Sequence, residues 1–512
     1  MRRAILAFLS LAATHWPGTL AGAADESLAD RFRAICDAVQ AHHVEAPTRQ
    51  QMLHAGIVAM YRAVRVPTPN GLGREISERT TYDQFSGLLE MVRPKPGGRA
   101  TTEAALDRAF LEGVSASVPG GLTIMEAKES KVAAQLAGNR YVGIQIAVTM
   151  DEASKRPRVT GLLEGGPAQR AGMKEGDVIE AVDGDALDGL TLGEYIDKLR
   201  GDEGTPVTVA VRRTGEKEPR TFRMNREAMR HATISGPAGP KGFRSEAAEA
   251  APGAARPGSF RIAGAGPIGY LKIEAILAST AREVREAAAK MEAEGLRAVV
   301  IDLRQMPRGR GSSETHPAVL LADELLDGGT IGRLRLANRE VTYRAEPGSL
   351  FPGWPMALLV DRATSEHAEW IAAALKANRR ATIVGTVTAG LGASRSTVPI
   401  GQGGRTASLV TGLLESPDGL PIGDIAPAVT ASMASADEPL DSPTQDARPG
   451  VTPDVAIAPA QHSVAGSGPG ARAEDSSLKA ALEVLGRALQ RPDTAVRDGK
   501  AKVPAAGGRD SG

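Results

Sequence analysis

Apolar residues recur at helical spacing through the N-terminal part of the chain. The segment after residue 25 places apolar residues on successive helical turns: Leu28, Phe32, Ile35 and Val39. Residues 52–64 repeat this pattern, and residues 82–92 indicate a third helix. Because each helix has one apolar face to bury, we predict a helical region over residues 24–138.

The pattern changes to short β-type segments after this region. Residues 139–230 form a β-rich module, in which apolar runs are separated by turn residues such as Asp183-Gly184. Residues 231–266 include a stretch rich in Gly, Pro and Ala without periodicity. We predict that they form a flexible linker.

Residues 267–460 alternate strands of the buried type with amphipathic helices. The predicted strands are IGYLKI, RAVVIDLR, MALLVD and ATIVGTV, and the predicted helices cover residues 279–294, 318–326 and 368–377. This alternation predicts a layered α/β core. A terminal helix is expected within residues 461–491, and the polar residues 492–512 are expected to be disordered. The predicted fold class is therefore multidomain α/β, with a helical N-terminal region, a β-rich module and a layered core.

The first residues have the features of a secretory signal. Arg2 and Arg3 carry positive charge, residues 4–13 are apolar, and residues 21–23 are small. The apolar run is too short to cross a bilayer. We therefore expect residues 1–23 to be removed and the mature protein to be periplasmic, without a stable membrane span.

Composition excludes several classes of function. Lys and Arg number 61, and Asp and Glu also number 61, so no overall positive field would attract nucleic acid. Cys36 is the single cysteine and cannot form an intramolecular disulfide. The histidines lack the spacing of metal ligands, so neither a metal site nor a cofactor is expected.

The β-rich module carries motifs in a fixed order. Residues 141–146 read YVGIQI, and residues 165–179 read GGPAQRAGMKEGDVI. These runs resemble the carboxylate-binding loop and the most recognisable segment of a PDZ domain. The resemblance implies that peptide or protein C-termini bind in a groove, where backbone amides hold the carboxylate and the peptide adds as a strand. The expected binding residues are Val142, Gly143, Ile144, Ile146, Leu192, Ile196 and Leu199. The alternative is that these residues only form the core of the module.

Two further segments carry a second resemblance. Residues 364–370 read TSEHAEW, and residues 388–395 read TAGLGASR. With the VIDLR run before them, they resemble the catalytic segments of the carboxyl-terminal processing peptidases, or tail-specific proteases. In that serine-type family, the nucleophile lies on a strand-to-helix turn, a Lys is the general base and a Gln supports the Lys.

The resemblance places non-catalytic residues at the catalytic positions. Glu366 stands at the position of the nucleophile, Leu391 at that of the base and Arg395 at that of the Gln. Arg308 replaces a glycine of the oxyanion loop. Leucine cannot accept the proton of a hydroxyl nucleophile, so no catalytic residue is expected. We expect the vacated site to be filled, with Glu366 and Arg395 close together and Leu391 packed beside them.

Three interpretations follow from these residues. The first is a secreted, non-catalytic PDZ-containing relative of the tail-specific proteases that binds C-terminal or extended peptides as an adaptor, scaffold or regulator. The alternative is an active serine-type endopeptidase that processes protein C-termini with a non-standard site, for which Ser365 is a candidate nucleophile. The third is a structural subunit that assembles with an active protease paralogue.

Overall fold

The structure is a computed structural model of the chain of 512 residues. It describes residues 26–95, 102–137, 141–151, 154–163, 165–186, 189–216, 218–237, 243–245, 259–306, 317–425, 450–458 and 475–490. The predicted signal segment and the predicted disordered tail lie outside these residues. The mixed helix-and-sheet, multidomain fold class predicted from the sequence is confirmed, whereas the domain boundaries remain predictions.

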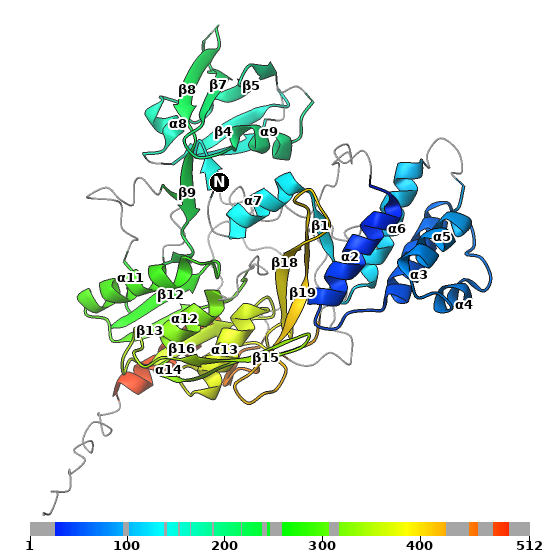
Figure 1. The fold of residues 1–512 in the computed structure, drawn as a ribbon. Helices are drawn as coiled ribbons and strands as arrows, with labels where there is room; N and C mark the ends of the chain where they lie inside the picture. Colours follow the sequence, from blue (N-terminus) through cyan, green and yellow to red (C-terminus); the bar gives the residue numbers. More distant parts are fainter. Residues whose placement is uncertain are drawn as a thin grey trace, which may run out of the picture.

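The N-terminal region is a group of packed helices (Figure 1). It contains α2 (Leu28–His42), α3 (Arg49–Ala63), α4 (Leu72–Ser77), α5 (Tyr82–Val92) and α6 (Glu103–Ser117). Phe32 of α2 makes edge-to-face contacts with Phe85 and Phe110, at centroid distances of 6.5 and 5.5 Å. Capping boxes at Thr48 and Thr81 begin α3 and α5 by satisfying their free amides.

A long hairpin joins this region to the rest of the molecule. It consists of β18 (Ala393–Pro399) and β19 (Thr406–Glu415), and Figure 1 shows it extending beside α2. Val398 and Leu409 are buried in the same apolar cluster as the N-terminal helices. β1 (Thr123–Met125), which precedes α7 (Ala127–Ala137), pairs antiparallel with β19. The N-terminal helices therefore share a core with this hairpin.

The β-rich module is a sheet folded over short helices. Its sheet has the order β3-β4-β5-β7-β8, with β6 beside β5. The elements are β3 (Ile146–Met150), β4 (Pro157–Leu162), α8 (Pro167–Arg170), β5 (Val178–Val182), β6 (Asp185–Ala186), α9 (Leu192–Leu199), β7 (Pro206–Arg212) and β8 (Arg220–Asn225). Alternate strand residues such as Val207, Val209 and Val211 are buried, as the period of two requires.

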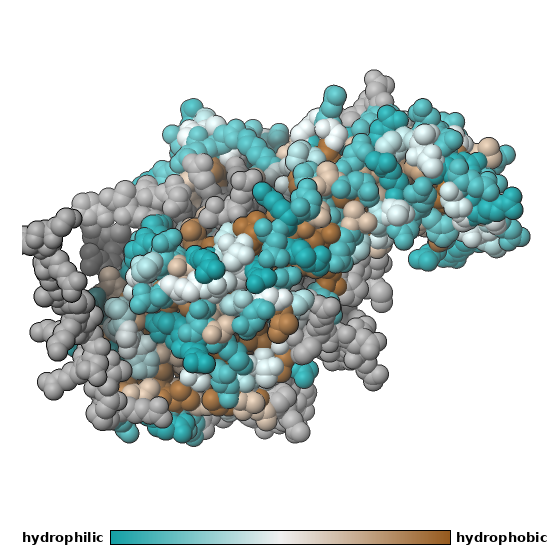
Figure 2. Space-filling view, turned by 60° about the horizontal axis from the view of Figure 1, so that its bottom comes forward, coloured by the Kyte–Doolittle hydropathy of each residue, from teal (hydrophilic) through white to brown (hydrophobic). Residues whose placement is uncertain are grey.

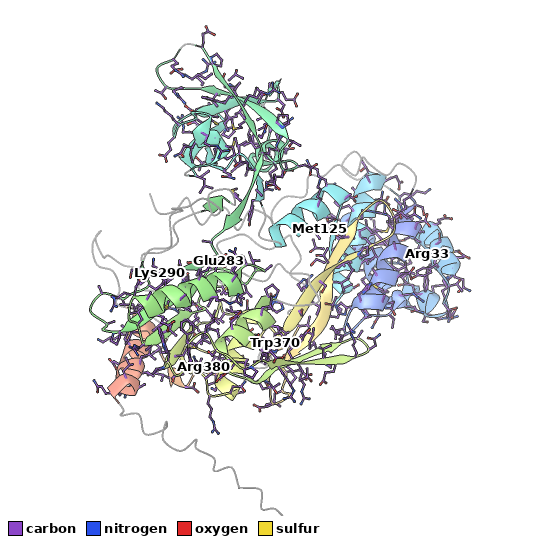
Figure 3. The ribbon with its side chains drawn as sticks, turned by 60° about the vertical axis from the view of Figure 1, so that its left-hand side comes forward. Arg33, Met125, Glu283, Lys290, Trp370 and Arg380 are labelled. Atoms are coloured by element: carbon purple, nitrogen blue, oxygen red, sulfur yellow. The ribbon has the colours of Figure 1, made fainter. Side chains whose placement is uncertain are left out.

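The connection from this module to the core differs from the predicted linker. β9 (Glu227–His231) leaves the module and pairs with β2 (Tyr141–Gly143) and β11 (Phe243–Ser245). Just after it, β10 (Ile234–Ser235) pairs with a core strand, and the amide of Thr233 donates to Glu283 Oε2 at 2.8 Å. Figure 3 labels Glu283 on α11, near the foot of this strand. Phe260 is also fully buried. The predicted linker of residues 231–266 therefore begins and ends within folded structure.

The core is a six-stranded sheet with helices on both faces. The strands follow the order β10-β12-β13-β16-β17-β20, and β12 to β20 are parallel. The elements are β12 (Ile268–Ile273), α11 (Thr280–Ala293), β13 (Ala298–Asp302), α12 (Pro317–Leu325), β16 (Met356–Val360), α13 (His367–Ala377), β17 (Thr382–Gly385), β20 (Val455–Ala456) and α14 (Ser476–Gln490). Val299 and Ile301 face α11 to α13, whereas Ala298 and Val300 face α14. Burial on both faces explains the continuous apolar runs in the sequence.

A second sheet was not predicted from the sequence. It has the order β1-β19-β14-β15, with β18 paired to β19, and its pairs are antiparallel. β14 (Gly329–Leu336) and β15 (Glu340–Ala345) form one hairpin of this sheet. Trp370, labelled in Figure 3, donates from Nε1 to the carbonyl of Glu415 at 2.8 Å. This bond ties α13 to β19 across the two sheets.

The hydropathy of the surface differs between the N-terminal helices and the core. In Figure 2, the N-terminal helices on the right present a largely hydrophilic surface, whereas hydrophobic side chains are more frequent over the core. Within the described ranges, no helix combines the length and the apolar character needed to cross a bilayer.

Candidate functional site

The turn between β16 and α13 holds Glu366 in an uncommon backbone conformation. The carboxylate of Asp361 accepts from the amides of Ala363 and Thr364 at 3.0 and 2.9 Å, and Thr364 Oγ1 donates to the carbonyl of Leu303 at 3.1 Å. Glu366 has φ +53° and ψ −118°, a region that side chains with a Cβ rarely adopt. β16 and α13 are therefore joined by a sharp strand-to-helix turn with Glu366 at its apex.

The loop before β18 is shaped by a close backbone crossing. The amide of Asp424 donates to the carbonyl of Gly390 at 3.0 Å, and a Cβ built on Gly423 would lie only 1.9 Å from that oxygen. Gly392 is similarly close, since its Cβ would lie 2.8 Å from the amide nitrogen of Gly423. Gly392 and Gly423 are thus required for packing, and Gly390 has a φ of +72°, which favours glycine.

Glu369 connects the turn to this loop. Its Oε1 accepts from Thr388 Oγ1 at 2.5 Å and from the amide of Gly390 at 2.6 Å. Its Oε2 accepts from the amides of Leu391 and Glu366, both at 2.9 Å. The residue is 0% exposed. Burial raises the pKa of the Glu369 carboxyl, while the four donors act in the opposite direction.

Sequence reasoning missed this role of Glu369. The signal was its position as the third residue of α13, where a Glu can accept from the amide of the preceding cap residue. Nothing in the sequence indicated that its carboxylate would also accept from Thr388, Gly390 and Leu391 in a later loop. Glu369 therefore links the turn at Glu366 to the loop at Leu391 through backbone amides.

Arg395 holds backbone carbonyls of other segments. Its guanidinium donates to the carbonyls of Gly120 at 2.6 Å, Gly121 at 3.0 Å and Ser408 at 3.0 Å. Burial lowers the pKa of Arg395, and the charge of Glu366 opposes this shift. The expected proximity of Glu366 and Arg395 stays a prediction. The three carbonyl contacts are additional, and they attach the loop between α6 and β1 to β18.

The remaining candidates occupy other environments. Arg308 lies outside the described residues, so its place in an oxyanion loop stays a prediction. Ser365 is buried next to Glu366. Lys376, the basic residue in the last turn of α13, donates to the carbonyl of Thr452 at 2.5 Å and lies 3.2 Å from Asp454. These contacts belong to the far end of α13. No cluster of His, Cys, Asp or Glu suited to a metal ion occurs in the part of the chain that the structure describes.

Some residues of the predicted peptide groove are buried in the module core, and others are only half-buried. β3 is at the end of its sheet order, so its outer edge is the one to which a peptide strand would add. Ile144 and Leu199 are buried in the module core, as the alternative interpretation expected. The half-buried residues that pack against this core are Ile146, Leu192 and Ile196. These three residues are the ones that retain accessible surface for a ligand.

The predicted carboxylate loop is partly used by the fold itself. Val142 pairs with Ala228 and Gly143 with Glu227 in the antiparallel ladder of β2 and β9. Successive residues of such a ladder alternate between bonding to the partner strand and pointing away from it. One of the amides of Val142 and Gly143 is therefore engaged with β9. The expectation that both are available to a carboxylate is corrected accordingly.

Comparisons with known proteins agree with both resemblances. Residues 267–430 match the profile of Peptidase family S41, and residues 158–213 match that of the PDZ domain. The carboxy-terminal-processing protease of Bartonella bacilliformis is 27% identical over 355 residues, which cover 68% of this chain and 74% of that protein. The chloroplastic C-terminal processing peptidase of Tetradesmus obliquus is 29% identical over 287 residues, 55% of this chain and 58% of that protein.

Among solved structures, the photosystem II D1 C-terminal processing protease aligns with 80% of this chain and 94% of its own, with 23% identity and a TM-score of 0.36. The chain is thus a multidomain protein that combines a PDZ domain with a peptidase S41 domain. It is similar to curated proteins named carboxy-terminal-processing protease and C-terminal processing peptidase.

His43, which contacts the loop that Arg395 binds, is expected to make the stability of the protein depend on pH. His43 Nε2 lies 2.9 Å from the carbonyl of Pro119, and His43 Nδ1 accepts from the amide of Glu45 at 3.0 Å. Only the neutral ring can make both bonds. Burial lowers the pKa of His43, and the charge of Arg395 lowers it further, against an opposing effect of Glu45.

We expect the contribution of His43 to be complete above pH of about 6.5, the ordinary pKa of His. It should be lost as pH falls towards the depressed pKa, because the unfolded chain then binds a proton that the folded chain does not. Urea midpoints measured from pH 7.5 to 5.5 should fall less steeply for His43→Gln. An unchanged slope in that variant would show that His43 does not carry this dependence.

The second prediction concerns Glu369. Glu369→Gln replaces one acceptor edge by an NH₂ group that faces two donors, so it should destabilise the S41 domain by about 2–4 kcal/mol. Trp370, the next residue of α13, is buried, and its fluorescence reports the unfolding of this domain in urea. Glu292→Gln, on the exposed face of α11, is the matched control and should leave the midpoint unchanged. A Glu369→Gln midpoint equal to that of the unaltered protein would contradict the proposed linkage.

Proposed function

We propose that this protein is an exported, non-catalytic member of the tail-specific protease family. It binds C-terminal or extended peptides through its PDZ domain and acts as an adaptor, scaffold or regulator. The observation that carries the proposal is the pair of loops joined by Glu369. The resemblance assigns these loops to the catalytic segments of the family, and here they present Glu366 and Leu391.

The chemistry of these two residues argues against amide hydrolysis. A hydroxyl nucleophile becomes effective when an adjacent base removes its proton, and the side chain of Leu391 has no such capacity. The carboxylate of Glu366 is a weak nucleophile towards an amide. Arg395 donates to three carbonyls, so its contacts serve the backbone and do not orient a base.

The active alternative would need a nucleophile elsewhere. Ser365 is adjacent to the apex of the turn, but it is 6% exposed and one residue away from the apex. In the described residues, Lys376 is bound at the opposite end of α13 to Thr452 and Asp454. The relatives that are named proteases make this alternative worth testing directly.

The PDZ domain supports the binding part of the proposal. β3 is the edge strand of its sheet, and within the described residues no strand of that sheet pairs with its outer edge. Ile146 on this strand and Leu192 and Ile196 on α9 remain half-buried. An edge strand beside a partly exposed apolar helix face is the arrangement that accepts an added peptide strand. Assembly with an active protease paralogue is compatible with the same surface.

Export is part of this proposal and depends on the sequence alone. Residues 1–23 have a basic start, an apolar stretch and small residues at their end. These features support a periplasmic location, in which the PDZ domain would meet exported proteins and their C-termini.

The absence of hydrolysis is the first test of the function. The purified protein should leave casein and peptides with apolar C-termini intact, at the rate of a blank without protein, and should not react with a fluorophosphonate probe. Ser365→Ala, prepared in parallel, is the control for contaminating host proteases. Turnover that Ser365→Ala abolishes would establish the active alternative.

Restoring two family residues should not restore activity. Glu366→Ser with Leu391→Lys supplies a hydroxyl and an amine, but Arg395 still holds its three carbonyls and Arg308 still replaces a glycine. Electrostatic stabilisation of the oxyanion would remain incomplete.

Peptide binding is the second test of the function. Hexapeptides that end in a free Ala, Val, Leu or Phe should bind more tightly than the same peptides with an amidated end, since a carboxylate makes stronger hydrogen bonds to backbone amides. Gly143→Trp should abolish binding, because a Cβ at Gly143 points towards the carbonyl of Leu199 at 3.6 Å and a large ring would fill that space. Fluorescence anisotropy measures both effects. Unchanged binding by Gly143→Trp would move the ligand site elsewhere.

A further inference from the structure

The predicted carboxylate loop lies at the C-terminal end of a helix. α9 ends at Leu199, and a Cβ built on Gly143 would lie 3.6 Å from the carbonyl oxygen of Leu199. The last carbonyls of a helix carry partial negative charge. A peptide carboxylate held near Gly143 would therefore face the unfavourable end of the α9 dipole.

Arg226 covers this end of α9. Its Nε donates to the carbonyl of Leu199 at 3.1 Å, and its NH2 group donates to the carbonyl of Lys198 at 3.0 Å. Its NH1 group donates to the carbonyl of Pro206 at 2.7 Å and to Thr205 Oγ1 at 3.3 Å. The side chain is only 9% exposed. A cation thus stands where the helix would otherwise present bare carbonyls.

The backbone places Arg226 next to Gly143 by a second route. Glu227, the residue after Arg226, pairs directly with Gly143 in the ladder of β2 and β9. Residues paired in this way have Cα atoms about 4.5–5.5 Å apart. Gly201 also leaves room for the guanidinium, since a Cβ there would lie 2.8 Å from Arg226 Nε. The position of Arg226 is therefore fixed by the strand, by the helix end and by Gly201.

The nearby carboxylates of Asp183 and Glu227 offset the positive charge of Arg226 only in part. Asp183 lies 3.4 Å from Arg226 and is 48% exposed, so water screens their attraction. Glu227 would repel a peptide carboxylate, but its own carboxylate accepts a hydrogen bond from Arg170. Arg226 is thus a desolvated cation beside Gly143 with one partly solvated acidic partner among the residues described.

We propose that Arg226 is the residue that makes this PDZ domain select a free terminal carboxylate. It acts as a positioning residue, because it neutralises the end of α9 and adds positive potential at the loop of Val142 and Gly143 without needing to touch the ligand. This inference depends on the proposed peptide binding. It assigns the charge recognition to a residue outside the loop itself.

The test compares two variants of the full chain with the same free and amidated hexapeptides. Arg226→Met should weaken binding of the free form by about three- to thirtyfold and leave the amidated form within about twofold. Arg226→Lys should recover most of the difference because it keeps the charge. A purely structural role would weaken both forms of peptide equally.

Asp183→Asn is the second variant, for the case in which Arg226→Met does not fold. Asn keeps the acceptor for the amide of Thr208 and tolerates the φ of +52° at this position. It removes the acidic partner of Arg226, so the preference for the free carboxylate should increase by about twofold or more.

The outcomes separate this inference from the proposed function. Equal binding of free and amidated peptides by the unaltered protein would overturn the proposed carboxylate recognition, and the role of Arg226 with it. A preference in the unaltered protein that neither Arg226→Met nor Asp183→Asn changes would overturn only the role of Arg226.

Discussion

The buried carboxylate of Glu369 is the constraint on which the geometry of the S41 site depends. Removing a carboxylate from water is unfavourable unless hydrogen-bond donors replace the lost hydration. Here the donors are Thr388 Oγ1 and the amides of Glu366, Gly390 and Leu391. The turn and the loop cannot separate without leaving this charge uncovered. That coupling explains how Glu366 keeps an unfavourable φ of +53°.

Under the proposed function, the fold of this protein has outlasted the chemistry for which its relatives are named. Gly392 and Gly423 leave no room for a Cβ where the two backbone segments cross. The positions that the resemblance assigns to the nucleophile and the base are occupied by Glu366 and Leu391. Since packing and catalysis place demands on different residues, one set can be lost while the other remains.

Several charged side chains in this protein form hydrogen bonds with backbone groups. Arg395 connects β18 to the loop at Gly120 and Gly121, and Arg226 covers the end of α9. Glu283 receives the amide of Thr233 where the chain passes from the PDZ domain to the core. Each of these contacts joins segments that are distant in the sequence. Hydrogen bonds to backbone groups therefore connect the PDZ domain and the N-terminal helices to the rest of the molecule, and the helices also share an apolar cluster with β18 and β19.

The sequence by itself determined the elements whose pattern is local. Continuous apolar runs identified β12, β13 and β16, and helical spacing identified α2, α3 and α11, because burial of those faces requires such patterns. Motif order likewise indicated the PDZ and S41 domains. β14, β15, β18 and β19 were missed, since their strands are only partly buried and carry mixed residues such as those in GTIGRLRL. The partners of Glu369, Arg395 and Arg226 were decided only by tertiary structure. A side chain's type shows that it needs donors or acceptors, but folding alone determines which distant backbone groups arrive beside it.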